Sequence, residues 1–139
     1  MPIISLLLAT SVALSAEIPD AVVVAIARHS GSADNNSFVC LTVAGKDPSK
    51  QLLSDIQQYV SGYVPGSKCV VRRGTPYLRG TDKHAKLMSI VDFRTHGEEA
   101  ATARVSSHFG PLSGGTWSAS LKLVDGAWSV ESTKTEVIH

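Results

Sequence analysis

The feature that most constrains this fold is an alternation of apolar and polar side chains in the last third of the chain. Apolar residues recur at nearly every second position in two runs, 101–109 and 117–123. A period of two puts these side chains on one face of a β-sheet and their polar neighbours on the other. The alternation therefore predicts an antiparallel meander of about four strands over residues 86–138, with an apolar face that must be covered.

The dipeptide Asp125-Gly126 is the strongest hairpin signal in the chain, because these residues tolerate the positive φ angles of a two-residue turn. Pairing around this turn brings apolar side chains together on one face. The pattern predicts Leu123 opposite Trp128 and Leu121 opposite Val130.

A second turn is expected at the loop Gly97-Glu98-Glu99. A three-residue connection there again brings apolar residues together on one face of the sheet. The predicted partners are Phe93 with Ala103, Val91 with Val105, Asp92 with Arg104 on the wet face, and Met88 with His108.

Residues 21–29 are predicted to form a helix. Pro19 and Asp20 suit the first turn of a helix and Gly31 suits the position just past its end. The β-branched run 22–24 also fits a strand, so the sequence leaves that alternative open.

The rest of the N-terminal half is predicted to form a strand, a helix and a strand. Residues 38–43 have the composition of a buried strand, and 64–72 include a second short one. Between them a helix is expected over 48–60, with Asp47-Pro48 as its N-cap and first residue. Packing these helices on the meander gives a single two-layer α+β domain over residues 17–139.

The first sixteen residues carry no charged side chain. An apolar run of roughly a dozen residues, from Ile3 to Leu14, is shorter than the roughly 20 residues of a membrane span and typical of a secretory signal peptide. The sequence therefore predicts a signal peptide at 1–16, a secreted or periplasmic protein, and no transmembrane segment in the mature chain.

The cleavage site stays open between two positions. Cutting after Ala16 leaves the bulky Leu14 at the minus-three position, whereas cutting after Ala13 puts the small Ser11 there but shortens the signal. The alternative to a signal peptide is that residues 1–16 form an amphipathic or buried N-terminal helix of the domain itself.

The chain has two cysteines, Cys40 and Cys69, with 28 residues between them. In an oxidising compartment an isolated pair of cysteines is most simply a disulfide. Neither belongs to a C-x-x-C motif, which argues against a redox role. We therefore expect a Cys40–Cys69 bridge that links the strand before the second helix to the strand after it.

The formal net charge of +1 gives no overall attraction to nucleic acid, and no nucleic-acid partner is expected. Basic residues nevertheless cluster locally, which is consistent either with a solvated loop or with a patch that binds an acidic partner. The cluster contains Lys68, Arg72, Arg73, Arg79, Lys83 and Lys86, with only Asp82 among them.

Tyr77 is the only aromatic residue in that basic segment. An exposed Tyr beside arginines is a common anchor at interfaces, although its ring could instead fold back onto the core. The candidate partner-binding residues are Arg72, Arg73, Tyr77 and Arg79.

No motif of phosphate-binding loops, zinc proteases or nucleophile elbows is present, so no catalytic residue and no cofactor is predicted. One cluster of polar side chains is expected, at the end of a strand. Asp82, His84 and His108 are the candidates for binding a divalent metal or for acid-base chemistry, with simple solvent exposure as the alternative.

The run from Leu121 to Val130 has the pattern L-x-x-x-x-G-x-W-x-V. With the preceding order of helix, strand, helix and meander, it resembles the nuclear-transport-factor-2-like and cystatin-like α+β group, mainly over residues 86–138. The resemblance implies a cone between helices and sheet, in which some members hold catalytic Asp, Tyr or His. The inward positions here are mainly apolar, so no catalytic residue is carried over.

Two functions follow as hypotheses. The first is a non-enzymatic secreted or periplasmic domain that binds a protein or small-molecule ligand. The second is a small enzyme or ligand-binding protein of the nuclear-transport-factor-2-like kind, which uses a pocket between helix and sheet. A buried cavity lined by Asp, Tyr or His favours the second, whereas a filled core with an exposed basic or aromatic loop favours the first.

Overall fold

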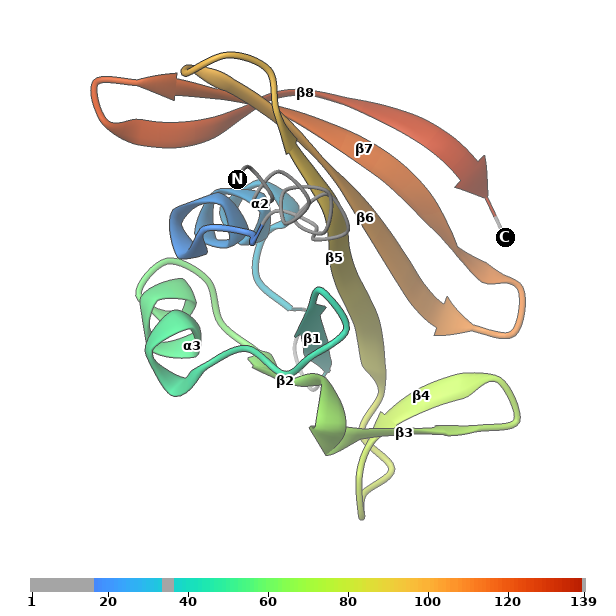
Figure 1. Cartoon of the computed structure of the whole chain (residues 1–139). Coiled ribbons are helices and arrows are strands. Elements are labelled where there is room, and N and C mark those ends of the chain that lie inside the picture. Colours follow the sequence, from blue (N-terminus) through green and yellow to red (C-terminus); the bar gives the residue numbers. More distant parts are fainter. Residues whose placement is uncertain (1–16, 34–36, 139) are drawn as a thin grey trace, which may run out of the picture.

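The computed structural model describes residues 17–33 and 37–138. Within these residues two helices and a 3₁₀ turn accompany eight strands, and six of the strands form one mixed sheet in the order β2-β1-β5-β6-β7-β8 (Figure 1). The strands are β1 (Phe38–Val43), β2 (Tyr63–Pro65), β3 (Cys69–Arg72), β4 (Thr75–Leu78), β5 (Ala85–Thr95), β6 (Ala100–Gly110), β7 (Ser113–Val124) and β8 (Ala127–Ile138).

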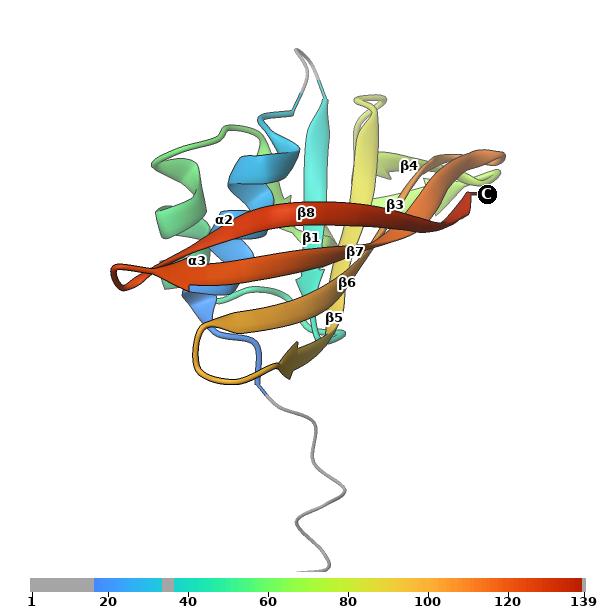
Figure 2. The ribbon, with the colours of Figure 1, turned by 90° about the horizontal axis from the view of Figure 1, so that it is seen from above.

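The remaining elements are α2 (Asp20–Ser30), α3 (Lys50–Gln57) and the 3₁₀ turn η1 (Gly66–Lys68). Both helices lie on the same side of the bent sheet (Figure 1). Seen from above, β7 and β8 run across the direction of β1 and β5, so the sheet curls around α2 (Figure 2). This is the right-handed twist of neighbouring strands, accumulated across a large sheet.

The core fills the space between the two helices and the concave face of the sheet. Among the described residues, every buried side chain of this core is hydrophobic, and no polar or charged side chain is buried. Its least exposed members are Val22, Val23, Ile26, Leu41, Ile56, Ile90, Val105 and Ala119.

The predicted fold class is wrong. Residues 86–138 do not form a separate four-stranded antiparallel meander, because β1 pairs in parallel with both β5 and β2, which makes the sheet six-stranded and mixed. β1 is apolar on both faces: Val39 and Leu41 lie in the main core, and Cys40 lies in a second cluster on the opposite face. A strand buried on both faces belongs inside a sheet, and β1 occupies such an interior position.

The register predicted around Asp125-Gly126 is confirmed, since Leu123 pairs with Trp128 and Leu121 with Val130. Asp125 and Gly126 both have positive φ, as the turn requires.

The register predicted for the hairpin of β5 and β6 holds only near its turn. Arg94 pairs with Thr102 as expected, but an irregularity between Val91 and Arg94 shifts the rest by one residue. Val105 therefore lies opposite Ile90 rather than Val91. In the same way Leu87 replaces Met88 as the partner of His108, whereas the expected contact of Asp92 with Arg104 is present as an ion pair.

Residues 21–29 are helical, as predicted. Asp20 lies in the first turn of α2, and Gly31 at its end has a φ of 85° and donates its N–H to the carbonyl of Ala27. The strand alternative fails because Val22, Val23 and Ile26 lie on one helical face and are fully buried there.

The second helix is shorter than predicted, and its N-cap is a different residue. The hydroxyl of Ser49 accepts the N–H of Leu52 at 3.1 Å, so α3 begins at Lys50. Asp47 is not the cap, because its carboxylate instead accepts hydrogen bonds from Ser67. Leu52 and Ile56 anchor the buried face of the helix.

The predicted signal peptide, residues 1–16, lies outside the described residues. Of the helices in 17–33 and 37–138, neither combines the length and apolar character that crossing a membrane would need.

Candidate partner-binding site

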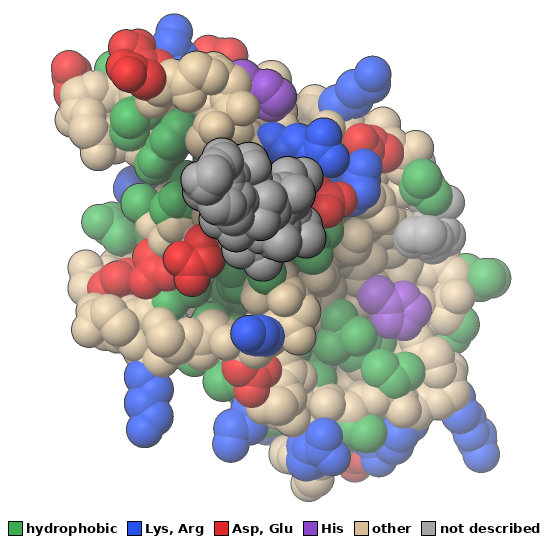
Figure 3. All heavy atoms as spheres, in the orientation of Figure 1, with side chains coloured by type: hydrophobic (Ala, Val, Ile, Leu, Met, Phe, Trp, Pro, Cys, Tyr) green, Lys and Arg blue, Asp and Glu red, His purple; other side chains and the backbone are tan. Residues whose placement is uncertain are grey.

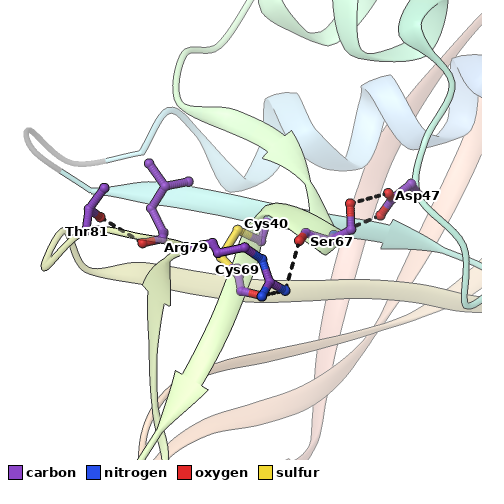
Figure 4. Close-up of a disulfide and its surroundings, with 7 residues drawn as sticks. Cys40, Asp47, Ser67, Cys69, Arg79 and Thr81 are labelled. Carbon is purple, nitrogen blue, oxygen red and sulfur yellow. Dashed lines mark hydrogen bonds between the residues drawn. A yellow bond between two sulfur atoms is a disulfide. The ribbon is translucent and has the colours of Figure 1, made fainter.

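The predicted disulfide is confirmed. Cys40 on β1 and Cys69 at the start of β3 are bonded, with their Cα atoms 6.1 Å apart (Figure 4). Both residues are buried, and Ala85 completes this second cluster of buried residues. The bridge therefore links the large sheet to the small sheet formed by β3 and β4.

The small sheet is a hairpin that the sequence analysis missed. β3 and β4 pair antiparallel from Cys69–Leu78 to Arg72–Thr75, and Arg73-Gly74 forms the two-residue turn. Arg73 has a φ of 53° and Gly74 a φ of 81°, which are the positive values of a type I′ turn. An X-Gly pair between β-branched and aromatic residues is the signal that could have revealed it.

Besides the disulfide, three contacts hold this hairpin and the 3₁₀ turn before it against the rest of the domain. At its base, the carboxylate of Asp47 accepts the Ser67 N–H at 2.9 Å and the Ser67 hydroxyl at 2.5 Å (Figure 4). At its tip, the Nε2 of His108 donates to the carbonyl oxygen of Gly74 at 2.8 Å. Gly74 also lies so close to Pro111 that a Cβ would meet it at 3.2 Å.

Strand pairing gives the hairpin two different faces. Cys69 and Leu78 share one face with Val71 and Pro76, whereas Val70 and Tyr77 share the other with Arg72 and Thr75. The first face is apolar and the second is basic and aromatic. We call them the apolar face and the basic face of the hairpin.

On the basic face, the Tyr77 ring contacts two other side chains. The guanidinium of Arg72 lies 4.3 Å from the centroid of the Tyr77 ring, and that ring lies 5.2 Å from the ring of His84. Arg72 and Tyr77 are diagonal neighbours across the strand pair, within reach of long side chains. A cation over an aromatic ring is favourable and orders the Arg side chain.

These side chains line a pocket of about 410 Å³ together with Arg73, Thr75 and Asp82. Arg72 also donates to the carbonyl of Thr81 at 2.9 Å. Its contact with Asp82 is long, at 3.6 Å, and the Asp82 side chain is fully exposed. A solvated pair of this kind contributes little, so Asp82 leaves Arg72 available to a competing carboxylate.

The pocket gathers three of the four predicted partner-binding residues, Arg72, Arg73 and Tyr77. Arg79 lies outside it and reaches the carbonyl oxygens of Ser67 and Cys69, both at 3.4 Å (Figure 4). Thr75 is the lining residue that the sequence analysis missed, because it comes into the pocket through its pairing with Arg72.

The three candidates for metal binding or acid-base chemistry are not brought together. Asp82 and His84 line the basic pocket, whereas His108 bonds to Gly74 and lines a different groove. Within residues 17–33 and 37–138 there is no group of three or more His, Cys, Asp or Glu side chains that could hold a metal ion.

A broad groove of about 840 Å³ lies at the outer rim of the helix-sheet layer, between α2, α3 and the turn of β7 and β8. Arg28 lies over the ring of Tyr59 there, at 4.1 Å, and both side chains are exposed. Behind this rim the layer is filled by apolar side chains.

Comparison with protein-family profiles, with curated proteins and with solved structures found no match for this chain. The resemblance of residues 121–130 to the nuclear-transport-factor-2-like and cystatin-like group therefore stays a prediction.

Proposed function

We propose that this protein is a non-enzymatic binding domain, which uses the basic face of the β3–β4 hairpin to bind an acidic segment of a partner protein. The observation that carries the proposal is the convergence of Arg72, Arg73 and Tyr77 on one pocket. Arg and Tyr, with Trp, are the residue types most enriched among interface residues that dominate binding energy.

The composition of the pocket surroundings supports an acidic partner. Lys and Arg side chains lie along the lower edge of the molecule in Figure 3, where the hairpin is found. The planar guanidinium of Arg72 can bind a carboxylate through two parallel hydrogen bonds, which a Lys cannot do. The half-buried Tyr77 ring lies beside that cation, and its exposed part can contact a neighbouring side chain of the partner.

The filled core supports a binding function over a pocket enzyme. The described interior between the helices and the sheet holds apolar side chains and no buried Asp, Glu, His, Lys or Arg; the one buried tyrosine, Tyr63, uses its hydroxyl to donate to the carbonyl of Gly31 at 3.3 Å. The four attachments of the hairpin support the same proposal, because a preorganised surface loses less entropy when a partner binds.

An extracytoplasmic location is part of the proposal. The disulfide supports it, since such bonds persist in oxidising compartments. Mass spectrometry of the protein recovered from its native source tests it. A mature N-terminus after Ala13 or Ala16 in the extracytoplasmic fraction is expected, and an intact Met1 in the cytosol would contradict it.

Charge reversal on the basic face tests the partner. The variant Arg72→Glu/Arg73→Glu is compared with the control Lys50→Glu/Lys134→Glu, which changes the net charge equally at exposed positions outside the pocket. Binding is measured by fluorescence anisotropy on a labelled panel of acidic peptides that contain one aromatic residue. The same variants are used to recover partners from the extracytoplasmic fraction.

The proposal expects peptide affinity to fall at least tenfold in the arginine variant and to stay within twofold in the lysine control. Partner proteins that the wild type recovers should also be recovered by the lysine control but not by the arginine variant. Equal binding by both variants, or no binding of any acidic peptide by the wild type, overturns the proposal.

A further inference from the structure

We propose that a second site lies on the opposite side of the same hairpin, where a groove takes a small, uncharged and largely apolar molecule with one hydrogen-bonding group. The groove has a volume of about 690 Å³ and lies between the apolar face of the hairpin and the outer face of β1, β5 and β6. This volume falls within the range of known small-molecule sites. The inference does not depend on the proposed partner.

The way the hairpin is attached keeps this groove open. One end is held by the Cys40–Cys69 bridge and the other by the His108 bond to Gly74 and the contact with Pro111. Between these ends the hairpin does not lie flat on the sheet. Val71 faces the groove and is 48% exposed, whereas its cross-strand partner Pro76 is buried.

The lining sets the chemistry of the ligand. Val71, Leu87, Pro111 and the disulfide provide apolar surface, and no Lys, Arg, Asp or Glu lines the groove. A charged ligand would lose its hydration there without meeting an opposite charge, which is costly. An uncharged ligand mainly loses the contact of its apolar surface with water, which favours binding, and its single polar group needs one hydrogen-bond partner in the groove.

Two serines supply the polar contact. Ser89 and Ser106 are direct partners across β5 and β6, so their side chains share the floor of the groove. The Ser106 hydroxyl pairs with Thr116 at 3.2 Å, whereas the Ser89 hydroxyl makes no hydrogen bond to any described residue. Ser89 is therefore positioned to bind one hydroxyl or carbonyl group of the ligand.

The test uses Nile red, an uncharged dye with a carbonyl group whose fluorescence rises in apolar surroundings. Val71→Asp places a carboxylate in the groove, and Val124→Asp is its matched control, because Val124 is 50% exposed and lies outside the groove. A second pair is Ser106→Phe, which fills the groove, and Ser120→Phe, which makes the same change on β7. Circular dichroism identifies any variant that fails to fold. If one groove variant does not fold, the comparison of the other groove variant with its control tests the proposal.

The expected result is saturable binding of one Nile red molecule to the wild type. The affinity should fall at least tenfold in Val71→Asp and Ser106→Phe and stay within twofold in both controls. Arg72→Glu/Arg73→Glu should bind the dye as the wild type does, which separates this site from the partner site. Unsaturable binding, wild-type affinity in the folded groove variants, or equal affinity for an anionic anilinonaphthalene sulfonate would overturn the proposal.

Discussion

The Nε2 of His108 lies 2.8 Å from the carbonyl oxygen of Gly74, and this bond joins the far end of β6 to the tip of a hairpin 34 residues earlier in the chain. A carbonyl oxygen only accepts, so Nε2 must carry the proton. The contact closes the groove at its tip, opposite the disulfide. The two candidate sites therefore share one structural support.

Replacing His108 should loosen the hairpin and leave the large sheet intact. His108→Ala is expected to cost about 1 kcal/mol of unfolding free energy, the usual net value of one hydrogen bond. Amide hydrogen exchange in Thr75–Leu78 should accelerate, while exchange in β7 stays slow. His96→Ala is the control, because His96 bonds to Thr102 near the other end of β6. Unchanged exchange in the hairpin of His108→Ala would refute this role.

Removing the disulfide should cost more. The variant Cys40→Ala/Cys69→Ala is expected to lose about 3 to 4 kcal/mol of unfolding free energy, because the bridge restricts the unfolded chain over a separation of 29 residues. Urea denaturation of the variant and the wild type measures this difference. Alkylation of both cysteines in denatured, unreduced wild-type protein would show that the bridge is absent.

The hydrogen bonds from the Ser67 hydroxyl and N–H, with the nearby charge of Lys68, hold the pKa of Asp47 below its ordinary value of 3.8. A lowered folded pKa means that Asp47 contributes stability above about pH 4, which is lost as the pH falls through the folded pKa. An NMR titration of the Asp47 carboxyl should show the low midpoint. Ser67→Ala should raise it and Ser61→Ala should not; an unchanged midpoint in Ser67→Ala would contradict this account.

Burial raises the pKa of Tyr63 from 10.0 to about 12. The unfolded chain ionises first as the pH rises, so the contribution of Tyr63 to stability is complete below pH 10 and is lost as the pH rises through about 12. An ultraviolet titration should show one late phenolate step. Tyr63→Phe should abolish that step, and a late step that survives the substitution would assign it to another tyrosine.

Gly62 and Gly126 form a matched pair for testing close packing. Both have positive φ, but a Cβ on Gly62 would lie 2.4 Å from the Cβ of Ala33, whereas nothing lies within 4 Å of one on Gly126. Gly126→Ala should cost about 1 kcal/mol for the strained backbone alone. Gly62→Ala should cost at least about 1 kcal/mol more in thermal unfolding, because Ala33 must move. Equal losses would mean that the two segments are not packed as described.

Local patterns predicted the parts of the fold that depend on neighbouring residues. Asp125-Gly126 determined the register of β7 and β8 next to the turn, as far as Leu121 and Val130, because a tight turn leaves one pairing that keeps the apolar side chains together. Beyond Leu121 two irregularities shift the pairing. Ala27 and Gly31 likewise form the predicted helix end. The cysteine pair was also readable, since two cysteines allow a single bridge.

The same local reading failed where distant segments compete for a partner. Nothing within β1 shows that it lies between β2 and β5, because any buried strand has the same composition. The irregularity after Val91 shifts the register of β5 by one residue, and periodicity alone does not locate such a shift. The basic segment could be recognised from composition. Composition did not show that a hairpin turn between Arg72 and Tyr77 brings the guanidinium over the ring.

The sequence by itself determined the alternating strands, the tight turn at Asp125-Gly126, the helix over 21–29 and the Cys40–Cys69 bridge. Each of these depends on residue types over a short span or on a pairing without competitors. Only the tertiary structure decided that β1 joins the large sheet and that the hairpin has a basic and an apolar face. Those outcomes depend on which segments, far apart in the sequence, bury the most apolar area when they pack together. The choice among such packings depends on every segment of the chain at once.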